Sequence, residues 1–389
     1  MDLYYGIDVA SEKHNCCIMD KNEKVLLEFS FSNDTVGFTQ LLHYLNHSHI
    51  PEGVKRNIGL EATGVYGENL TNFLMRNGFE VTTFNPLTVK KQLSATTLRK
   101  TKTDKSDAKF LATMLARGNY KPDVPVLYHI SELKSLSRRR FLTVKKRSGA
   151  KNIAKALLTK LFPEYLKIFS DTFGTTSMAI LRNYPSAKEI AACRPSSLSK
   201  ILKSSSKGRF GIDKAKEIIN IAKNSIGKYS AADALSLSLT LEEIDFFSKQ
   251  IDRIEKEIHI IFKENPSPIL SIPGVGEVLG AMIISEIGNI QRFSNHNKLL
   301  AFAGLEPSIS ESGKRNSSSG SMVKRGSPYL RWAIMWAART VPRYSQTFAK
   351  YFDKKSDEGK HFNVAVSHVA KKLIRVIFSL EKNNSVFVD

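Results

Sequence analysis

The first 85 residues alternate between short apolar runs and amphipathic stretches. Three β-rich runs come first, and the polar turn at residues 20–22 predicts a hairpin between the second and the third. Two helical patterns follow, and each precedes another apolar run. The predicted strands cover residues 3–9, 14–19, 24–31, 56–62 and 79–84, and the predicted helices cover residues 34–47 and 68–76.

This order, three strands and then alternating helices and strands, is that of a ribonuclease H-like domain. We therefore expect an α/β fold for residues 1–128, with a mixed sheet in which the first strand lies centrally beside the fourth. A further helix, predicted for residues 104–117 with Thr103 as its N-cap and Gly118 as its stop, should pack across these two strands.

The middle of the chain, residues 129–265, has helical periodicity. A long, mostly basic helix is predicted for residues 131–161. The Ser-rich stretch from 163 to 239 is weakly patterned, has one clear helix near 214–222, and is interpreted as an inserted subdomain of unknown role at about 165–239.

A capping box at Thr240 to Glu243 predicts the start of another long helix. Beyond it, apolar residues recur at spacings of three and four, which is typical of a coiled-coil seam. The seam either packs on its own chain or pairs with a second copy, and the pattern favours neither. Its members are Ile244, Phe247, Ile251, Ile254, Ile258 and Ile261. A compact domain at 266–345 and a helical tail at 346–389 follow.

Positive charge is concentrated in one part of the chain. The 58 Lys and Arg residues exceed the 37 Asp and Glu residues by 21. Residues 89–160 hold 19 cations and four acids, which is +15 of that excess. Solvated helix faces would explain part of it, but so dense a patch favours contact with phosphate backbones. The candidate contacts here are Lys100, Lys102, Lys105, Arg138, Arg139, Arg140, Lys145, Lys146 and Arg147.

The remaining composition narrows the class of protein. The three cysteines, Cys16, Cys17 and Cys193, have no CxxC spacing, which argues against a disulfide framework and a zinc site. No basic region leads into an apolar one at the N-terminus, and no apolar stretch approaches about 18 residues. We expect a soluble, cytoplasmic protein without a membrane partner.

Four carboxylates occupy positions where a core would favour apolar residues. Asp8 interrupts the first strand, Glu61 ends the fourth, and Asp104 and Asp107 share one face at the head of the 104–117 helix. Singly, they could serve as caps or turn acids. Together in one cleft they would require divalent cations, and oxygen ligands select Mg²⁺ or Mn²⁺. Two such ions about 4 Å apart would clamp a phosphodiester.

The C-terminal domain has two further candidate features. The segment Ile272-Pro-Gly-Val-Gly276 resembles a helix-hairpin-helix turn, in which Gly274 and Gly276 offer N–H groups to a phosphate; a tight interhelical turn is the alternative. A Ser- and Gly-rich loop then spans residues 308–321. Cations lie within this loop and after it, as expected of a nucleic-acid site: Lys314 and Arg315 in the loop, then Lys324, Arg325 and Arg331.

Six segments in this order resemble one known family, the DEDD insertion-sequence transposases, which combine a RuvC-like nuclease domain with a serine transposase domain. They span nearly the whole chain outside the middle insertion. The matching segments are YYGIDVASEKH, GLEATGVYG, TDKSDAKFLA, IPGVGEVLGAMIISEIG, LLAFAGLEPSISESG and KRGSPYLRWAI.

The resemblance implies that Asp8, Glu61, Asp104 and Asp107 bind the metal ions. It implies a nucleophilic serine, Ser312, that forms a covalent phosphoserine with DNA; without the resemblance, the seven serines of the loop are equivalent. It also implies a noncoding bridge RNA that guides recombination. It further implies a homo-oligomer, a dimer or a tetramer, in which each active site is built from more than one subunit. It also implies a location at the prokaryotic nucleoid.

Three alternatives remain open at this level. A junction-resolving nuclease would use the same four acids with water as its nucleophile. An actin-like ATPase would share the sheet and the Gly-Ile-Asp-Val start at residues 6–9, although no second glycine-rich phosphate turn is evident. A non-catalytic nucleic-acid-binding protein would retain the fold without its metal chemistry.

Overall fold

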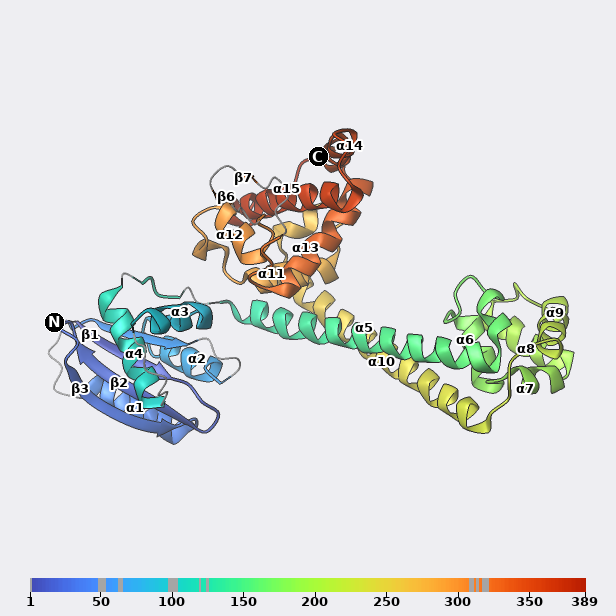
Figure 1. Cartoon of the computed structure of the whole chain (residues 1–389), viewed down its shortest axis with the longest axis horizontal. Helices are drawn as coiled ribbons and strands as arrows, with labels where there is room; N and C mark the ends of the chain where they lie inside the picture. Colours follow the sequence, from blue (N-terminus) through green and yellow to red (C-terminus); the bar gives the residue numbers. More distant parts are fainter. Residues whose placement is uncertain are drawn as a thin grey trace. The chain divides into compact units, whose positions relative to one another are not determined.

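The computed structural model forms two compact units, Met1–Pro125 and Val126–Asp389, each described by itself below (Figure 1). Its described residues are 2–47, 54–61, 66–96, 104–118, 120–123, 126–307, 311–312, 315–316 and 322–389.

The N-terminal unit is built on a five-stranded sheet with the strand order β3-β2-β1-β4-β5. β1 pairs antiparallel with β2 and parallel with β4, so the sheet is mixed and the first strand lies beside the fourth, as predicted. β2 and β3 form the predicted hairpin. The strands are β1 (Leu3–Asp8), β2 (Lys13–Asp20), β3 (Val25–Ser32), β4 (Arg56–Glu61) and β5 (Val81–Phe84).

Helices cover both faces of this sheet. One buried cluster includes Phe38 and Leu41 of α1 with Leu70 and Leu74 of α2, and a second includes Leu111 of α4. α3 occupies a basic stretch for which the pattern predicted no helix. The helices are α1 (Thr35–His47), α2 (Glu68–Arg76), α3 (Pro86–Thr96) and α4 (Asp104–Arg117).

Two glycines let α4 lie directly on the sheet. A Cβ atom on Gly6 of β1 would lie 2.1 Å from the Ala108 carbonyl oxygen and 2.3 Å from the Ala112 nitrogen. A Cβ atom on Gly59 of β4 would lie 2.6 Å from Leu115 Cδ1. Since Gly6 and Gly59 are neighbours in the parallel pair, α4 crosses β1 and β4 at this point.

The second unit contains two long helices, α5 (Tyr128–Leu161) and α10 (Ala231–Glu264), packed along each other (Figure 1). They are antiparallel, because Arg140 of α5 pairs with Glu255 of α10 while Lys160 pairs with Asp233. The seam residues Ile244, Ile251 and Ile258 are buried, and α10 therefore has its packing partner within the same chain.

The predicted start of α10 is wrong by ten residues. Ser230 is the N-cap and accepts a hydrogen bond from the Asp233 N–H, whereas Thr240 lies inside the helix and donates to the Ser236 carbonyl. The reason is that the apolar stripe continues back through Leu241 and Leu237, so the helix extends to the earlier capping serine.

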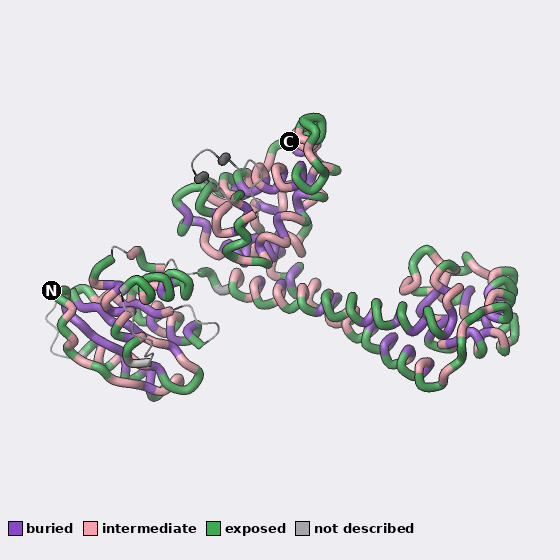
Figure 2. The backbone as a smooth tube through the Cα atoms, in the orientation of Figure 1, coloured by how far each residue is buried: buried purple, intermediate pink, exposed green. Residues whose placement is uncertain are grey.

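The stretch between α5 and α10 is also more ordered than its pattern predicted, since it forms several helices instead of one. Each helix is short and buries only a few side chains, such as Leu198 and Leu202 of α8. The sequence of each helix therefore has no long apolar stripe by which it could be recognised. Figure 2 shows their buried sides facing a common core. They are a 3-10 helix (Pro163–Lys167), α6 (Thr175–Asn183), α7 (Ala187–Ala192), α8 (Pro195–Ser205) and α9 (Ile212–Lys223).

The C-terminal part of this unit packs around α11, whose residues from Gly280 to Ile287 are all buried. α15, from the segment assigned above to a tail, contributes Val369, Leu373 and Ile377 to the same core. Among the described helices, none has the length and apolar composition of a membrane span. The helices are α11 (Glu277–Ile287), α12 (His296–Ala303), α13 (Pro328–Thr340), α14 (Gln346–Asp357) and α15 (Phe362–Asn383).

Candidate active site

Asp8 and Glu61 lie side by side at one edge of the sheet. β1 and β4 run parallel with Ile7 opposite Leu60, so the next residue of each strand is one of these two acids. Both side chains are half-buried. The carboxyl ends of parallel strands therefore place two carboxylates together, as the strand order predicted.

α4 brings its first turn toward the same edge. Its last residue, Arg117, forms a two-bond ion pair with Glu23 at 2.6 and 2.7 Å, in the turn between β2 and β3. That turn lies beside the start of β1, because Leu3 pairs with Asp20. Since Ala108, near the other end of α4, packs on Gly6, the helix runs opposite to β1 and its N-terminal turn lies toward Asp8.

Asp104 and Asp107 occupy this N-terminal turn. Asp107 is half-buried, and the side chain of Asp104 lies outside the described residues. Among the side chains that the structure does describe, no three Asp, Glu, His or Cys residues are close enough to hold a metal ion. The backbone thus gathers the four acids at one edge of the sheet.

The donor set at this edge nevertheless fits a hard divalent cation. All four candidates are carboxylates, the ligands that Mg²⁺ and Mn²⁺ prefer. They come from three elements whose packing is fixed by the close contact at Gly6.

His14 was missed by the sequence reasoning. It lies in β2, is fully buried, and its Nδ1 accepts a hydrogen bond from the Ala10 N–H at 3.2 Å. Burial lowers the pKa of His14, which favours the neutral imidazole that this bond requires. The histidine therefore fixes the loop that follows Asp8; its signal in the sequence was a lone polar residue at the start of an apolar strand.

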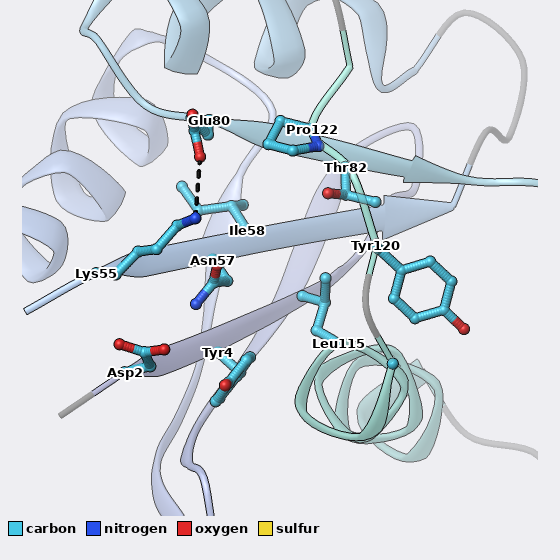
Figure 3. Close-up of a pocket in the computed structure, with 11 residues that line it drawn as sticks. Asp2, Tyr4, Lys55, Asn57, Ile58, Glu80, Thr82, Leu115, Tyr120 and Pro122 are labelled. Carbon is cyan, nitrogen blue, oxygen red and sulfur yellow. Dashed lines mark ion pairs between the residues drawn. The ribbon is translucent and has the colours of Figure 1, made fainter. Parts of the chain in front are cut away.

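A polar pocket of about 210 Å³ lies at the opposite end of the same strands (Figure 3). Tyr4, Asn57 and Thr82 line it from β1, β4 and β5. Lys55 and Glu80 form an ion pair of 3.5 Å across part of it. Because it lies at the amino ends of β4 and β5, this pocket is separate from the carboxylate edge.

Ser312 lies in a small hairpin between α12 and α13. It ends β6 (Glu311–Ser312) and pairs with Arg315 of β7 (Arg315–Asn316). The side chains of both residues are outside the described set, as are residues 308–310, 313–314 and 317–321 with Lys314 and the other loop serines. The structure therefore places the Ser312 backbone and does not distinguish its hydroxyl from those of its neighbours.

Backbone hydrogen bonds tie the two ends of this hairpin together. The Val323 N–H donates to the Glu306 carbonyl at 2.9 Å, and the Ser327 N–H donates to the Phe302 carbonyl at 3.2 Å. Gly326 has a φ of +105°, and a Cβ atom there would lie 1.9 Å from the Phe302 oxygen, so only glycine fits. The backbone on both sides of the hairpin is thus held in a fixed position.

A buried charge network supports that base. The Glu286 side chain, 2% exposed, accepts hydrogen bonds from Arg138 at 2.5 and 2.9 Å and from Ser327 Oγ at 2.7 Å. Ser327 also caps α13 by accepting from the Leu330 N–H, and the Arg138 guanidinium lies 4.8 Å from the centre of the Tyr329 ring. The Glu286 carboxylate therefore joins α5, α11 and α13. In the sequence Glu286 lies in an apolar run, and nothing there indicates this role.

The electrostatics of Glu286 follow from these contacts. Burial alone would raise the pKa of this carboxyl, but the hydrogen bonds from Arg138 and Ser327 outweigh it, and the pKa lies below its ordinary value. An acid with a lowered pKa stabilises the fold at higher pH. This contribution is present above the unfolded-state pKa, roughly 4.3, and is lost as the pH falls through the folded-state pKa.

We expect Glu286→Ala to lower the free energy of unfolding by about 2–3 kcal/mol, measured by urea denaturation at neutral pH. The reason is that Arg138 and Ser327 lose their partner in a buried site. The effect is smaller than for a fully buried pair because the Arg138 side chain is 41% exposed. As a control, Glu255→Ala removes the ion pair of Arg140 with a carboxylate that is 37% exposed, and it should cost less than about 1 kcal/mol. Equal effects of the two substitutions would contradict this role.

Several of the predicted nucleic-acid contacts also have structural partners. Besides Arg138, Arg140 pairs with Glu255 at 2.6 Å, Arg147 donates to Ser248 Oγ at 3.3 Å, and Arg331 donates to the Ala303 carbonyl at 3.4 Å. Five of the candidates form none of these contacts: Arg139, Lys145 and Lys146 line a shallow surface of α5, and Lys324 and Arg325 lie exposed after the hairpin. Lys100 and Lys102, and the side chain of Lys105, lie outside the described residues.

The glycine turn before α11 contains two different positions. Gly274 has a φ of +89°, its carbonyl accepts from Thr340 Oγ1 at 3.1 Å, and a Cβ atom there would lie 3.1 Å from Val341 Cα. A Cβ atom on Gly276, the residue before α11, would meet nothing within 4 Å. Gly274 is thus required by packing, whereas Gly276 is exposed and an added side chain there would face open space.

Comparison with known proteins gives matches in both units. A family model described as a transposase of the DEDD IS110 type matches residues 5–163. A second, described as a transposase of the IS116/IS110/IS902 family, matches residues 267–353. The four carboxylates lie within the first match. The second match contains the Ser312 hairpin, and it also contains α11 and α13, which the Glu286 network joins.

Individual relatives agree with these matches. The chain is 23% identical to a mini-circle protein of IS117 from Streptomyces coelicolor, over 96% of this chain and 92% of the relative. It is 21% identical to the pilin gene-inverting protein of Moraxella lacunata, over 99% and 97% of the two chains. A shorter match, 31% identical, covers 32% of this chain and 36% of the transposase for IS1111A from Coxiella burnetii.

Proposed function

Because the chain belongs to the IS110 family of DEDD transposases, we propose that it cuts and rejoins the DNA of an insertion sequence through a covalent protein–DNA intermediate. The observation that carries this proposal is the gathering of Asp8, Glu61 and the first turn of α4 at one edge of a ribonuclease H-like sheet. A relative named as a gene-inverting protein is consistent with strand exchange as the reaction. The family membership also disfavours the ATPase alternative.

The four carboxylates would hold the divalent cations on which this family depends, two Mg²⁺ or Mn²⁺ ions in each site. When bound, such ions stabilise the negative charge that develops on the phosphodiester oxygens during strand cleavage. The part of the protein is to fix the acids on β1, β4 and α4. The close contact of α4 with Gly6 and the hydrogen bond from Ala10 to His14 serve that purpose.

Ser312 is the proposed nucleophile. Its Oγ would form a bond to phosphorus while the bond from phosphorus to a deoxyribose oxygen breaks, and the serine proton would leave to a carboxylate or to water. The phosphoserine keeps the energy of the phosphodiester, so the strand can be rejoined without an external energy source. The tied base of the hairpin and the Glu286 network would limit the positions open to this serine.

The remaining assignments complete the proposal. The exposed cations of α5 and of the hairpin region, with the N–H groups at the glycine turn before α11, would contact the DNA or a noncoding bridge RNA that selects donor and target. The helix-hairpin-helix description of that turn remains a prediction. We also propose a homo-oligomer, in which the serine of one subunit meets the carboxylates of another.

The test is denaturing electrophoresis of the protein after incubation with Mg²⁺, element-end DNA and the RNA encoded beside its gene. We expect a protein–DNA adduct that withstands denaturation and is absent when EDTA replaces Mg²⁺. Metal-dependent cleavage that leaves free DNA ends and no adduct would instead support the junction-resolving nuclease. DNA binding without cleavage under all metal conditions would support the non-catalytic alternative.

A further inference from the structure

The helical insertion between α5 and α10 has a strongly basic surface that the family match does not explain. The family models match up to residue 163 and again from residue 267, so they leave this insertion out. Residues 163–230 contain 12 Lys or Arg and five Asp or Glu, a net charge of +7. Figure 1 shows α6 to α9 grouped beside the end of the α5/α10 pair.

α8 and α9 form a helical hairpin with a well-defined turn. The Gly208 N–H donates to the Lys203 carbonyl at 2.9 Å, and the Phe210 N–H donates to Ser206 Oγ at 3.0 Å. Phe210 packs into the core of the insertion with its ring centre 5.9 Å from that of Phe169. The turn is therefore anchored at both ends.

The backbone of this turn directs a lysine outward. Lys207 has a φ of +54°, a left-handed conformation that costs a lysine free energy, and Gly208 follows with a φ of +83°. Lys207 and Arg209 are both exposed at the tip of the hairpin. The fold thus holds two cations on a short, fixed loop instead of on a flexible tail.

The hairpin cations have no carboxylate partners among the described residues. Lys203, Lys207, Arg209 and Lys216 are exposed and form none of the ion pairs found there. Other cations of the insertion behave differently, since Arg182 pairs with Asp245 at 2.6 Å and Lys214 with Glu217 at 2.7 Å.

The acids nearby do not neutralise the hairpin. Glu217 is already paired with Lys214, and Asp213 is the remaining acid of the segment. Residues 200–217 contain six Lys or Arg and two Asp or Glu, which leaves +4 in 18 residues. Such an unpaired, preorganised cluster complements a polyanion.

We propose that the α8–α9 hairpin binds the phosphodiester backbone of a duplex nucleic acid, which adds a contact surface to the proposed recombinase and rests on that function. Lys203, Lys207, Arg209 and Lys216 would each meet a phosphate, and their side chains read no base edges. The hairpin therefore anchors the nucleic acid and contributes affinity rather than sequence preference. Both the DNA and an RNA stem present this chemistry.

The experiment compares the full-length protein with two charge-reversal variants. One combines Lys207→Glu and Arg209→Glu at the turn. The other combines Lys203→Glu and Lys216→Glu on the helix surfaces, which avoids the left-handed residue. A matched control, Lys350→Glu with Lys354→Glu, makes the same charge change on α14, where Asp353 and Asp357 lie nearby. Circular dichroism checks that each variant is folded.

Binding to a labelled DNA duplex and to a labelled RNA duplex, each of about 30 base pairs, is measured as a function of salt. We expect each hairpin variant to bind at least about tenfold more weakly, and the slope of log K against log salt to fall by about 2, since two phosphate contacts are lost. The control should keep the slope of the parent protein.

The two probes distinguish the sources of the phosphate. Weakening with both duplexes supports a general contact with the phosphate backbone, weakening with the DNA duplex alone assigns the hairpin to DNA, and weakening with the RNA duplex alone assigns it to RNA stems. Parental affinity and slope in both variants with both probes would overturn the inference. The proposed function is judged separately by adduct formation, so an adduct formed by the parent protein together with unchanged binding in the variants would remove only this surface.

Discussion

Replacing Asp8 by asparagine is expected to lower the rate of strand cleavage at least ~1,000-fold, because one of two adjacent carboxylates at the proposed cation-binding edge is lost. Asn is nearly the same size, so β1 and its contact with α4 should persist. The measurement is single-turnover cleavage of element-end DNA in Mg²⁺.

Asp107→Asn, in the first turn of α4, should give the same loss and leave the affinity for RNA within a few fold.

The matched control for this experiment is Asp2→Asn. Asp2 precedes the same strand but lines the pocket at the opposite end of the sheet (Figure 3), so the same change of charge there should leave cleavage near the parental rate. Intact recombination by the Asp107→Asn protein would count decisively against the carboxylate edge as the active site.

The Ser312→Ala substitution is expected to eliminate the covalent adduct and strand cleavage together, since the chain would lose the proposed nucleophile while keeping its carboxylates. DNA affinity should change little, because a hydroxyl on the hairpin contributes no charge. Adduct formation and free DNA ends are followed on the same denaturing gel. The Ser312→Cys substitution provides a second readout, because an adduct through a phosphorus–sulfur bond would be chemically distinct from phosphoserine.

The other serines of the loop are the controls. Ser308→Ala, Ser310→Ala and Ser317→Ala should each retain the adduct. If one of these eliminated it while Ser312→Ala did not, the nucleophile would be reassigned within the same hairpin. Undiminished cutting by Ser312→Ala, with free ends and no adduct, would favour a nuclease that uses water.

The sheet and its carboxylate edge could be predicted from the sequence because their signals are local. Each strand is a short apolar run closed by turn residues, and the order of strands and helices limits the possible topologies to a few. The parallel pairing of β1 with β4 then follows, and it makes Asp8 and Glu61 neighbours. The glycines that bring α4 onto the sheet, Gly6 and Gly59, are visible in the sequence, but their role depends on contacts that only the folded chain supplies.

The features that the sequence did not reveal depend on tertiary context. The helices of the insertion are too short to have a periodic stripe, and the start of α10 was displaced because a capping-box pattern at Thr240 is equally compatible with a helix interior. Glu286 lies in an apolar run, and its partner Arg138 is 148 residues away. No pattern along the chain links an arginine in a basic helix with a glutamate so distant from it.

The length of α5 has a mechanical consequence. Leu133 belongs to the core around α11 and Leu158 to the core of the insertion, and a single uninterrupted helix connects them. The 25 residues between them correspond to a rise of about 38 Å, close to one turn of a DNA duplex. Adding or deleting one residue in this segment would turn the following residues of α5 by about 100° around its axis, out of register with α10, which also contributes to both cores. The number of residues in α5 therefore sets both the distance between the two cores and the rotation of one end of the helix relative to the other.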